Sequence, residues 1–371
     1  MSGYKNLAEA QIQKIAGKYF SKREEKSSAQ DDPVIVFVGA QPGAGKSAAA
    51  DKVRCELVKQ GGYIHVDADR MREEIPIQDC KPTSEETQGD AGKLANALRA
   101  LAIDGRRNVI EEGTLRGPGI MKHVTERAHK QGYQTELVAV ATHEEESLLG
   151  IYERFEKQHL NPALNPRFVT EEYHQGALAG FTENLAKDAG GFDRVRVVNR
   201  DGQTLFDSAA RENRHTGPYE ALLKGRELTP ERLCSLAQGW ERVRTLAEAR
   251  HAPRDHLEQI GQHRNRVSDL GKARAHIDGM KHLDKNIAAL SRDPRYQAHS
   301  DGELAKAAYW RGACESAQAA LGAPLDMSLF DSRMADRAKV AELPDVAGLD
   351  GREITREKPG GRELDEPGRE L

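Results

Sequence analysis

The sequence predicts an α/β fold over its first 210 residues: a parallel sheet of five strands flanked by helices. Five short apolar stretches are candidate strands, at residues 34–38, 63–66, 108–111, 136–140 and 194–198. Because helical stretches separate them, right-handed crossovers should bring the strands into one parallel sheet. The first stretch, Val34 to Val38, is apolar throughout, as a central strand buried on both faces should be.

The helices are predicted from apolar spacing and from glycine at their ends. Leu7, Ile12, Ile15 and Phe20 lie near helical spacing and predict a leading helix within residues 4–27. Further helices are expected at residues 46–60, 84–103, 119–130 and 144–159. Glycines follow several of these stretches, at positions 61, 62, 105 and 132, as is common at helix C-termini.

The pattern changes after residue 210. Residues 211–345 are rich in Ala, Leu, Glu, Arg and Gln, with prolines as breaks, and they predict an all-α extension anchored by Trp240 and Trp310. Residues 346–371 repeat Gly-Arg-Glu and contain almost no large apolar side chain, so a disordered tail is expected. The predicted domains are therefore a sheet domain over 1–210, the extension and the tail.

Composition excludes several classes of protein. The 371-residue chain has a formal net charge of −4 and no block of basic residues, so neither nucleic acid nor a membrane surface is expected as a partner. No stretch approaches the roughly 18 apolar residues that span a bilayer, and the N-terminus has no apolar core of a signal peptide. The four cysteines lie far apart without a C-x-x-C pair, which fits a reducing cytoplasm.

A glycine-rich loop directly follows the first strand and precedes a helix. It matches G-x-x-x-x-G-K-S and comprises Gly39, Ala40, Gln41, Pro42, Gly43, Ala44, Gly45, Lys46 and Ser47. Glycines let the backbone wrap an anion, and the following helix directs its positive dipole end at it. Lys46 is expected to reach the β- and γ-phosphates of ATP, and the Ser47 hydroxyl to hold Mg²⁺. The loop therefore predicts binding of a nucleoside triphosphate and does not by itself give the reaction.

Acidic residues follow the second and third strands, where open α/β sheets bind ligands. Asp67 and Asp69 are spaced i, i+2 at the end of the second strand; one of them could accept the proton of an acceptor hydroxyl. Capping of the following helix is an alternative of about equal weight. Glu111 to Arg116 suits recognition of a polar acceptor, and its alternative is a turn with solvated charges. His65 is expected to be an ordinary strand residue.

Two arginines lie beyond the fourth strand. Arg154 belongs to a predicted helix, and Arg167 follows an Asn-Pro loop. Kinases of this architecture often bring such arginines onto the transferring phosphate, where they stabilise the charge of the transition state. An arbitrary arginine is more often a solvated surface residue, so this assignment depends on the ordered set of motifs.

Taken in order, these motifs resemble the zeta-toxin family, P-loop kinases of bacterial toxin–antitoxin systems, over roughly residues 30–210. The motifs are the P-loop, Val66-Asp-Ala-Asp-Arg70, Ile110-Glu-Glu-Gly-Thr114, Tyr152-Glu-Arg-Phe-Glu156, Arg167 and Val198-Asn-Arg-Asp-Gly202. The resemblance implies transfer of the ATP γ-phosphate to the 3′-hydroxyl of the amino sugar of UDP-N-acetylglucosamine or a related UDP-sugar. The product blocks synthesis of cell-wall precursors.

The resemblance also implies residue roles. Lys46, Arg154 and Arg167 match the family's catalytic cations, and Asp69 matches the catalytic base. The positions expected on the acceptor side are Asp67, Glu112, Thr114 and Arg116. A further acceptor-binding acid of the family has no clear counterpart here, because Ala95 and Asn96 occupy the best-aligned positions.

Alternatives stay open for the acceptor and for the class of protein. Asp69 would serve equally for a nicotinamide nucleotide, an antibiotic hydroxyl or a nucleic-acid end, although the last also predicts a basic surface. A nucleotide-dependent binding module acting through the helical C-terminal half is the hypothesis from another class. The family implies a small helical antitoxin as partner; the leading helix or the C-terminal helices could take its place.

Overall fold

The computed structural model describes residues 4–24, 26–76, 83, 86–161, 166–210 and 217–290. The predicted tail, Trp310 and the extension beyond residue 290 lie outside the described residues. The chain divides into two compact units after Val267. The first unit contains the sheet and everything that surrounds it, and the second begins at Ser268.

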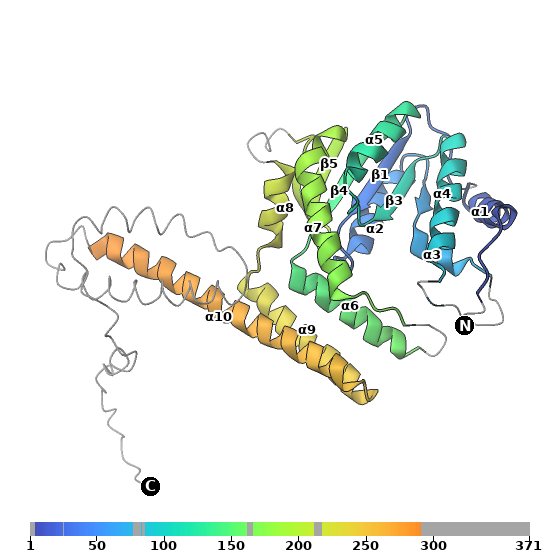
Figure 1. The fold of residues 1–371 in the computed structure, drawn as a ribbon. Helices are drawn as coiled ribbons and strands as arrows, with labels where there is room; N and C mark the ends of the chain where they lie inside the picture. Colours follow the sequence, from blue (N-terminus) through green and yellow to red (C-terminus); the bar gives the residue numbers. More distant parts are fainter. Residues whose placement is uncertain are drawn as a thin grey trace, which may run out of the picture. The chain divides into compact units, whose positions relative to one another are not determined.

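A six-stranded sheet in the order β2-β3-β1-β4-β5-β6 forms the centre of the first unit (Figure 1). Its strands are β1 (Val34–Gly39), β2 (Ile64–Val66), β3 (Val109–Gly113), β4 (Gln134–Ala141), β5 (Arg194–Asn199) and β6 (Thr204–Asp207). β1 pairs with β3 on one side and with β4 on the other, both in parallel. The strand with the most uniformly apolar sequence is therefore the central one, as expected of a strand covered on both faces.

Helices cover both faces of the sheet. The helices of the first 210 residues are α1 (Glu9–Glu24), α2 (Lys46–Val58), α3 (Ala68–Glu73), α4 (Gln88–Asp104), α5 (Ile120–Lys130), α6 (Glu144–His159) and α7 (Glu171–Asp188). Alternate residues of β1 enter two separate cores: Val36 and Val38 pack with α2 residues, whereas Ile35 and Phe37 join the larger core on the other face. Both cores converge on β1, so the loop that follows it starts from the most fixed strand of the sheet.

The five predicted parallel strands are confirmed, and the structure adds a short 3-10 helix (Ala189–Gly191) and three longer elements. β6 pairs antiparallel with β5; it is four residues long and buries only Phe206, too little for an alternation to be visible. α3 is a six-residue helix. The apolar spacing of the sequence does not predict α7, because the polar residues His174 and Asn184 occupy buried positions on it.

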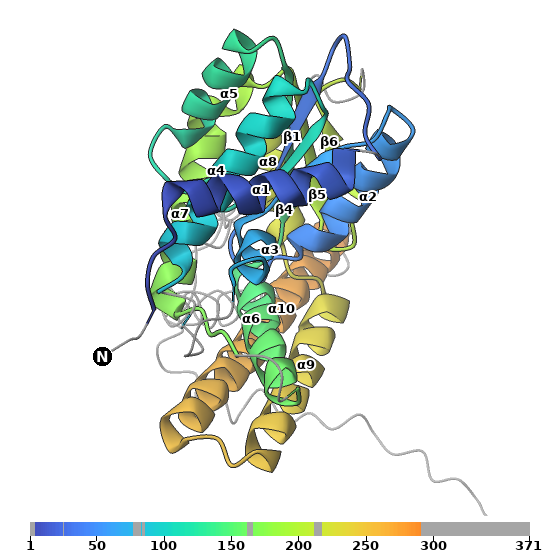
Figure 2. The same ribbon diagram turned by 90° about the vertical axis from the view of Figure 1, so that its right-hand side faces the viewer.

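The leading helix α1 is confirmed and lies across α4 (Figure 2). Leu7, Ile12 and Ala16 are buried in the larger core. At its entrance, the buried carboxylate of Asp90 accepts 2.7 Å hydrogen bonds from the Tyr4 hydroxyl and the Leu7 backbone N–H. The buried acid in the first turn of α4 is thus used to dock the segment that precedes α1.

The helical extension begins within the first compact unit. α8 (Pro218–Arg226) packs on β4 and β5 with Leu222 fully buried, and α9 (Pro230–Ala249) packs on α6. α10 starts at Arg254 and runs to Leu290. The domain boundary near residue 210 stays a prediction, and α8 and α9 beyond it both pack on elements of the sheet domain. No helix among the described residues has the length and apolar character needed to cross a membrane.

Trp240 allows a test of the contact between α9 and α6. Its side chain is completely buried, and its ring lies 5.1 Å from that of Tyr152 on α6. Trp240→Ala is expected to lower the free energy of unfolding by about 3–5 kcal/mol, because it leaves a large cavity at a helix–helix contact. Chemical denaturation measures this, with Trp240→Phe as a milder control. A loss under about 1 kcal/mol would show that α9 is not packed on α6 in solution.

Candidate active site

The P-loop is shaped by two glycines with positive φ. Gly43 has φ 75° and Gly45 has φ 90°, a region that residues with a Cβ rarely adopt. A Cβ at Gly43 would also lie 2.0 Å from the carbonyl oxygen of Ser147 on α6. The loop backbone therefore touches α6 directly, and only glycine fits at this point.

Side chains fasten the P-loop to the junction of β4 and α6. The buried amide of Gln41 donates hydrogen bonds to the Thr142 carbonyl (2.9 Å) and the Ser147 hydroxyl (3.2 Å). The Thr142 hydroxyl donates to the Ala44 carbonyl at 2.8 Å. Ser147 in turn lies 2.8 Å from the ring of His174 on α7. The loop is thus held in its curved form before any ligand arrives.

Lys46 and Ser47 lie at the start of α2, where the helix dipole favours an anion. The Lys46 ammonium donates to the carbonyls of Ala40 (3.0 Å) and Gln41 (3.1 Å). Burial lowers the pKa of Lys46 to about 8, although the neighbouring Glu112 acts in the opposite direction. The Ser47 side chain is exposed. These residues fit a nucleoside triphosphate with its cation. The Lys46 ammonium is a donor that lies against the loop, and the exposed Ser47 hydroxyl is accessible to a metal ion.

Asp69 and Arg167 meet although 98 positions separate them in the sequence. Arg167, just before α7, donates to the Asp69 carboxylate at 3.0 Å, and Arg72 pairs with the same oxygen. Burial raises the pKa of Asp69, but the two arginines outweigh it and hold the pKa below its ordinary value. Asp67 has the other role predicted for this motif: its carboxylate caps α3 by accepting the Asp69 N–H at 2.8 Å.

The two acids at the end of β3 point to opposite faces of the sheet. Glu111 pairs with Arg99 of α4. Glu112 lies 2.9 Å from the ring of His65 and 3.4 Å from Arg54. Burial raises the pKa of Glu112, but His65 and Arg54 keep it below its ordinary value.

The remaining acceptor-side residues follow β3. Thr114 is half-buried, and the exposed Arg116 lies 4.3 Å over the ring of Tyr173. His65, Asp67 and Glu112 also bring one ligand atom each within 4.8 Å of one another. Glu112 is already paired with His65 and Arg54, and Asp67 with the start of α3, so we assign no metal to them.

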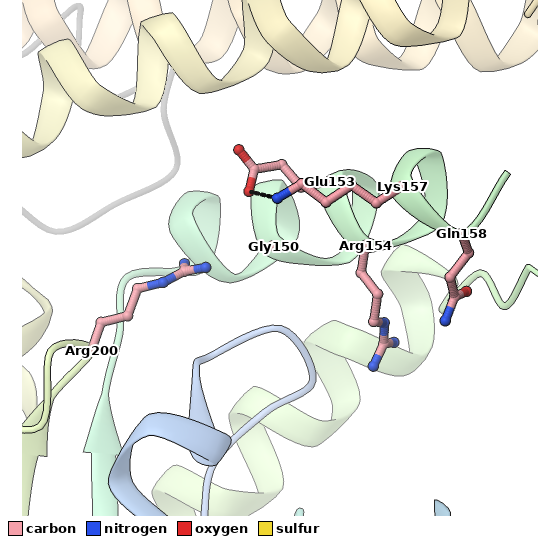
Figure 3. Close-up of a pocket in the computed structure, with 6 residues that line it drawn as sticks. All are labelled: Gly150, Glu153, Arg154, Lys157, Gln158 and Arg200. Carbon is pink, nitrogen blue, oxygen red and sulfur yellow. Dashed lines mark ion pairs between the residues drawn. The ribbon is translucent and has the colours of Figure 1, made fainter. Parts of the chain in front are cut away.

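Arg154 projects from α6 beside a polar groove of about 310 Å³ (Figure 3). The groove is lined by Gly150, Glu153, Arg154, Lys157, Gln158 and Arg200. It adjoins the P-loop, because a Cβ at Gly150 would lie 2.6 Å from the Gly43 carbonyl and Arg200 lies against Gly45. Figure 3 shows Arg154 and Gln158 on one side of α6, and Glu153 and Lys157 on the other. Three cations beside a phosphate loop suit a polyanionic ligand.

The structure thus brings together Lys46, Asp69 and Arg167 with Arg154. Burial lowers the pKa of Arg154, and the charges that act on it are those of Asp69, which raises it, and Arg167, which lowers it. The predicted site lacked two residues that the structure supplies. Arg72 follows Asp69 by one helical turn, and Arg200 lies in the turn after β5, within the motif Val198–Gly202, which is part of the resemblance but has no predicted role.

A parallel sheet of this order, with a glycine-rich loop between its central strand and a helix, defines a P-loop protein of the kinase type. Comparison with known proteins gives the family. The Zeta toxin family model matches residues 18–211, more than half of the chain. The chain therefore belongs to the zeta-toxin family, a family of kinase-type toxins.

Individual proteins of known sequence or structure are also similar to this chain. The toxin PezT of Streptococcus pneumoniae serotype 4 is 28% identical over 211 residues, which cover 55% of this chain and 82% of PezT. A structure from the PezAT chromosomal toxin–antitoxin system of the same species has a TM-score of 0.57 at 22% identity and covers 66% of this chain and all of that one. The AvrRxo1-ORF1:AvrRxo1-ORF2 complex with sulphate ions has a TM-score of 0.45 at 13% identity, covering 69% and 87%.

His174 links the site to acid stability. It is fully buried, and burial lowers its pKa from 6.5 to about 4. The unfolded chain therefore binds a proton that the folded protein rejects, so stability is complete above about pH 6.5 and is lost as the pH falls towards 4. The slope contributed is at most about 1.4 kcal/mol per pH unit. Urea denaturation across this range measures it.

The control isolates this histidine from other acid-sensitive groups. His174→Gln should flatten the pH dependence between pH 6.5 and 4, whereas His123→Gln, at an exposed position of α5, should leave it as in the wild type. Equal slopes for the wild type and His174→Gln would contradict the assignment.

Proposed function

We propose that this protein is an ATP-dependent kinase toxin. It phosphorylates the 3′-hydroxyl of the amino sugar of UDP-N-acetylglucosamine or a related UDP-sugar and so blocks synthesis of cell-wall precursors. The observation that carries the proposal is the contact between Asp69 and Arg167, which joins a strand-end acid to an arginine from a distant segment at the P-loop edge. A nucleotide-binding module without catalysis has no need of this pair.

The P-loop and the groove beside it supply the ATP site. Backbone N–H groups of the loop and the start of α2 would hold the phosphates, with Lys46 on the β- and γ-phosphates and Arg200 beside Gly45. Ser47 would hold Mg²⁺, which neutralises phosphate charge when bound. The hydrogen bonds of Gln41 and Thr142 hold the backbone of the loop that would bind the phosphates.

Arg154, Arg167 and Asp69 would carry the chemical step. Asp69 is ionised across the physiological range because its pKa is lowered, so it can accept the proton of the acceptor hydroxyl. Its contact with Arg167 weakens it as a base. We expect the transferring phosphate to draw Arg167 away, so that the arginine stabilises the anion while the carboxylate becomes a stronger base.

The acceptor would lie between Asp67, Glu112, Thr114 and Arg116. Glu112 is a carboxylate held by His65 and Arg54, well suited to accept hydrogen bonds from sugar hydroxyls. Of the positions aligned with the family's further acceptor-binding acid, Ala95 is buried and the Asn96 amide oxygen accepts from Arg99 at 2.7 Å. We therefore expect the residues at the end of β3 to determine which UDP-sugar is bound.

A small helical antitoxin is the proposed partner, and the cytoplasm, where UDP-sugars are made, the proposed location. The PezAT structure comes from a toxin–antitoxin system. In this chain, α1 is packed on α4 through buried Leu7, Ile12 and Ala16, so it is already used in the core. The antitoxin is therefore expected to be a separate chain that covers the ATP site.

Asp69→Ala tests the reaction and the base together. The variant is expected to lose at least 100-fold in kcat while still binding ATP, because general-base catalysis typically contributes 10²–10⁴-fold. Mass spectrometry of a panel of UDP-sugars incubated with protein, ATP and Mg²⁺ measures the added phosphate. Asp67→Ala is the matched control and should lose far less in rate, and about 1 kcal/mol in stability as a lost helix cap. Full activity of Asp69→Ala would refute the assignment.

The lowered pKa of Lys46 predicts that activity falls at alkaline pH. Its ammonium must be protonated to bind phosphate, and burial lowers its pKa to about 8 in the free protein. kcat/KM for ATP should therefore fall above about pH 8, with the protonated form active on the acid side. A steady-state pH profile measures this. A profile that stays flat to pH 10 would show that the ammonium keeps its proton.

A further inference from the structure

The helical extension contacts both segments that carry the catalytic arginines. Arg154 lies on α6 and Arg167 lies four residues before the start of α7. Figures 1 and 2 show α9 beside α6. We call the residues of α9 and of α10 up to Val267 that contact α6 and α7 the clasp; all belong to the first compact unit.

The first part of the clasp is aromatic. The Trp240 ring of α9 is stacked on His263 of α10, with centroids 4.4 Å apart and planes inclined by 3°. Tyr152 of α6 packs edge-on against both rings, at 5.1 and 5.3 Å. All three residues are fully buried. Tyr152 precedes Arg154 by two positions, so this packing fixes the helix turn from which Arg154 projects.

The second part holds the far end of α6 and the residue after Arg167. The buried carboxylate of Glu156 accepts from Arg250 (2.6 Å) and lies 2.7 Å from the His256 ring. The Phe168 ring packs edge-on against Tyr152 at 4.9 Å and lies 5.8 Å from His256. Phe168 thereby anchors the backbone next to Arg167 in the same aromatic cluster.

The third part joins α6 directly to α7. One ring nitrogen of His263 lies 3.1 Å from Glu145 of α6, and the other lies 2.9 Å from Glu171 of α7. Arg266 lies 3.4 Å from each of the same two carboxylates. Two acids from different helices, which repel each other, are therefore held together by a histidine and an arginine of α10.

We infer that the clasp positions Arg154 and Arg167 for phosphoryl transfer, with His263, Arg266 and Glu171 as positioning residues. The inference rests on the proposed function for its catalytic meaning. Ser147 joins α6 to the P-loop and also contacts His174 of α7. The clasp holds α6 from Glu145 to Glu156, and it holds α7 at its first residue, Glu171. The extension then helps to hold the two arginines in place. A misplacement of about 1 Å of such a catalytic group can cost roughly 100-fold in rate.

Glu171→Ala is the decisive variant, and Glu172→Ala is its matched control. Both remove an acid from the first turn of α7, so their effects on the helix dipole are alike, but only Glu171 contacts His263. We expect Glu171→Ala to lower kcat by roughly 10- to 100-fold with KM for ATP changed less than about twofold. Glu171→Gln, which keeps an acceptor for His263, should recover most of the rate. Arg266→Ala and Arg264→Ala form a second pair, since Arg264 pairs with Glu241 of α9, whereas Arg266 lies beside the carboxylates of α6 and α7.

Hydrogen exchange of residues 150–158 and 166–175 gives a readout that needs no catalysis. The rate of hydrogen exchange in these two segments should rise in Glu171→Ala and stay unchanged in Glu172→Ala. Each variant is measured well below its melting temperature. Equal kcat and equal exchange in the two variants would overturn the inference. If the wild type phosphorylates no acceptor, the proposed function fails, and the exchange measurement alone decides whether the clasp holds these segments.

Discussion

The close contact between the P-loop and α6 is the constraint on which the rest of the site depends. Gly43 faces the carbonyl of Ser147, and Gly150 faces the carbonyl of Gly43, so two backbones touch where side chains would collide. Interfaces of this density behave as one body. The phosphate loop and the helix that carries Arg154 therefore keep a fixed geometry, and a nucleotide bound to one is presented to the other.

Around this contact, several charges assigned to chemistry already have a partner within the protein. Lys46 rests on two loop carbonyls, Arg167 on Asp69, and Glu112 on His65 and Arg54. Ligand binding is then an exchange of partners. In the proposed mechanism this exchange reduces affinity, because each internal contact must be broken, but it gives the reaction an order, since the proposed base strengthens as the phosphate takes Arg167.

Much of this arrangement could be predicted from the sequence, for reasons that are local. The P-loop needs glycines at fixed spacing between an apolar strand and a helix, and Asp69 lies where a strand ends. Helix α7 and strand β6 could not be predicted this way. His174 is buried because it meets Ser147 on another helix, and β6 buries a single large side chain. Pairings such as Asp69 with Arg167 depend on how distant segments meet, which periodicity does not record.

The contacts of the helical extension could also not be predicted from the sequence. Its helices have modest apolar faces, which favours the interpretation of an appendage that only docks. In the structure, α9 and α10 instead contact Tyr152, Glu156 and Glu171, close in sequence to the two arginines proposed for catalysis. A helix pair that only stabilised the fold would gain more from apolar burial than from a histidine between two carboxylates, since desolvated charges are costly unless they are well paired. The polar character of the contact is therefore better explained by a need for defined geometry between α6 and α7 than by stability.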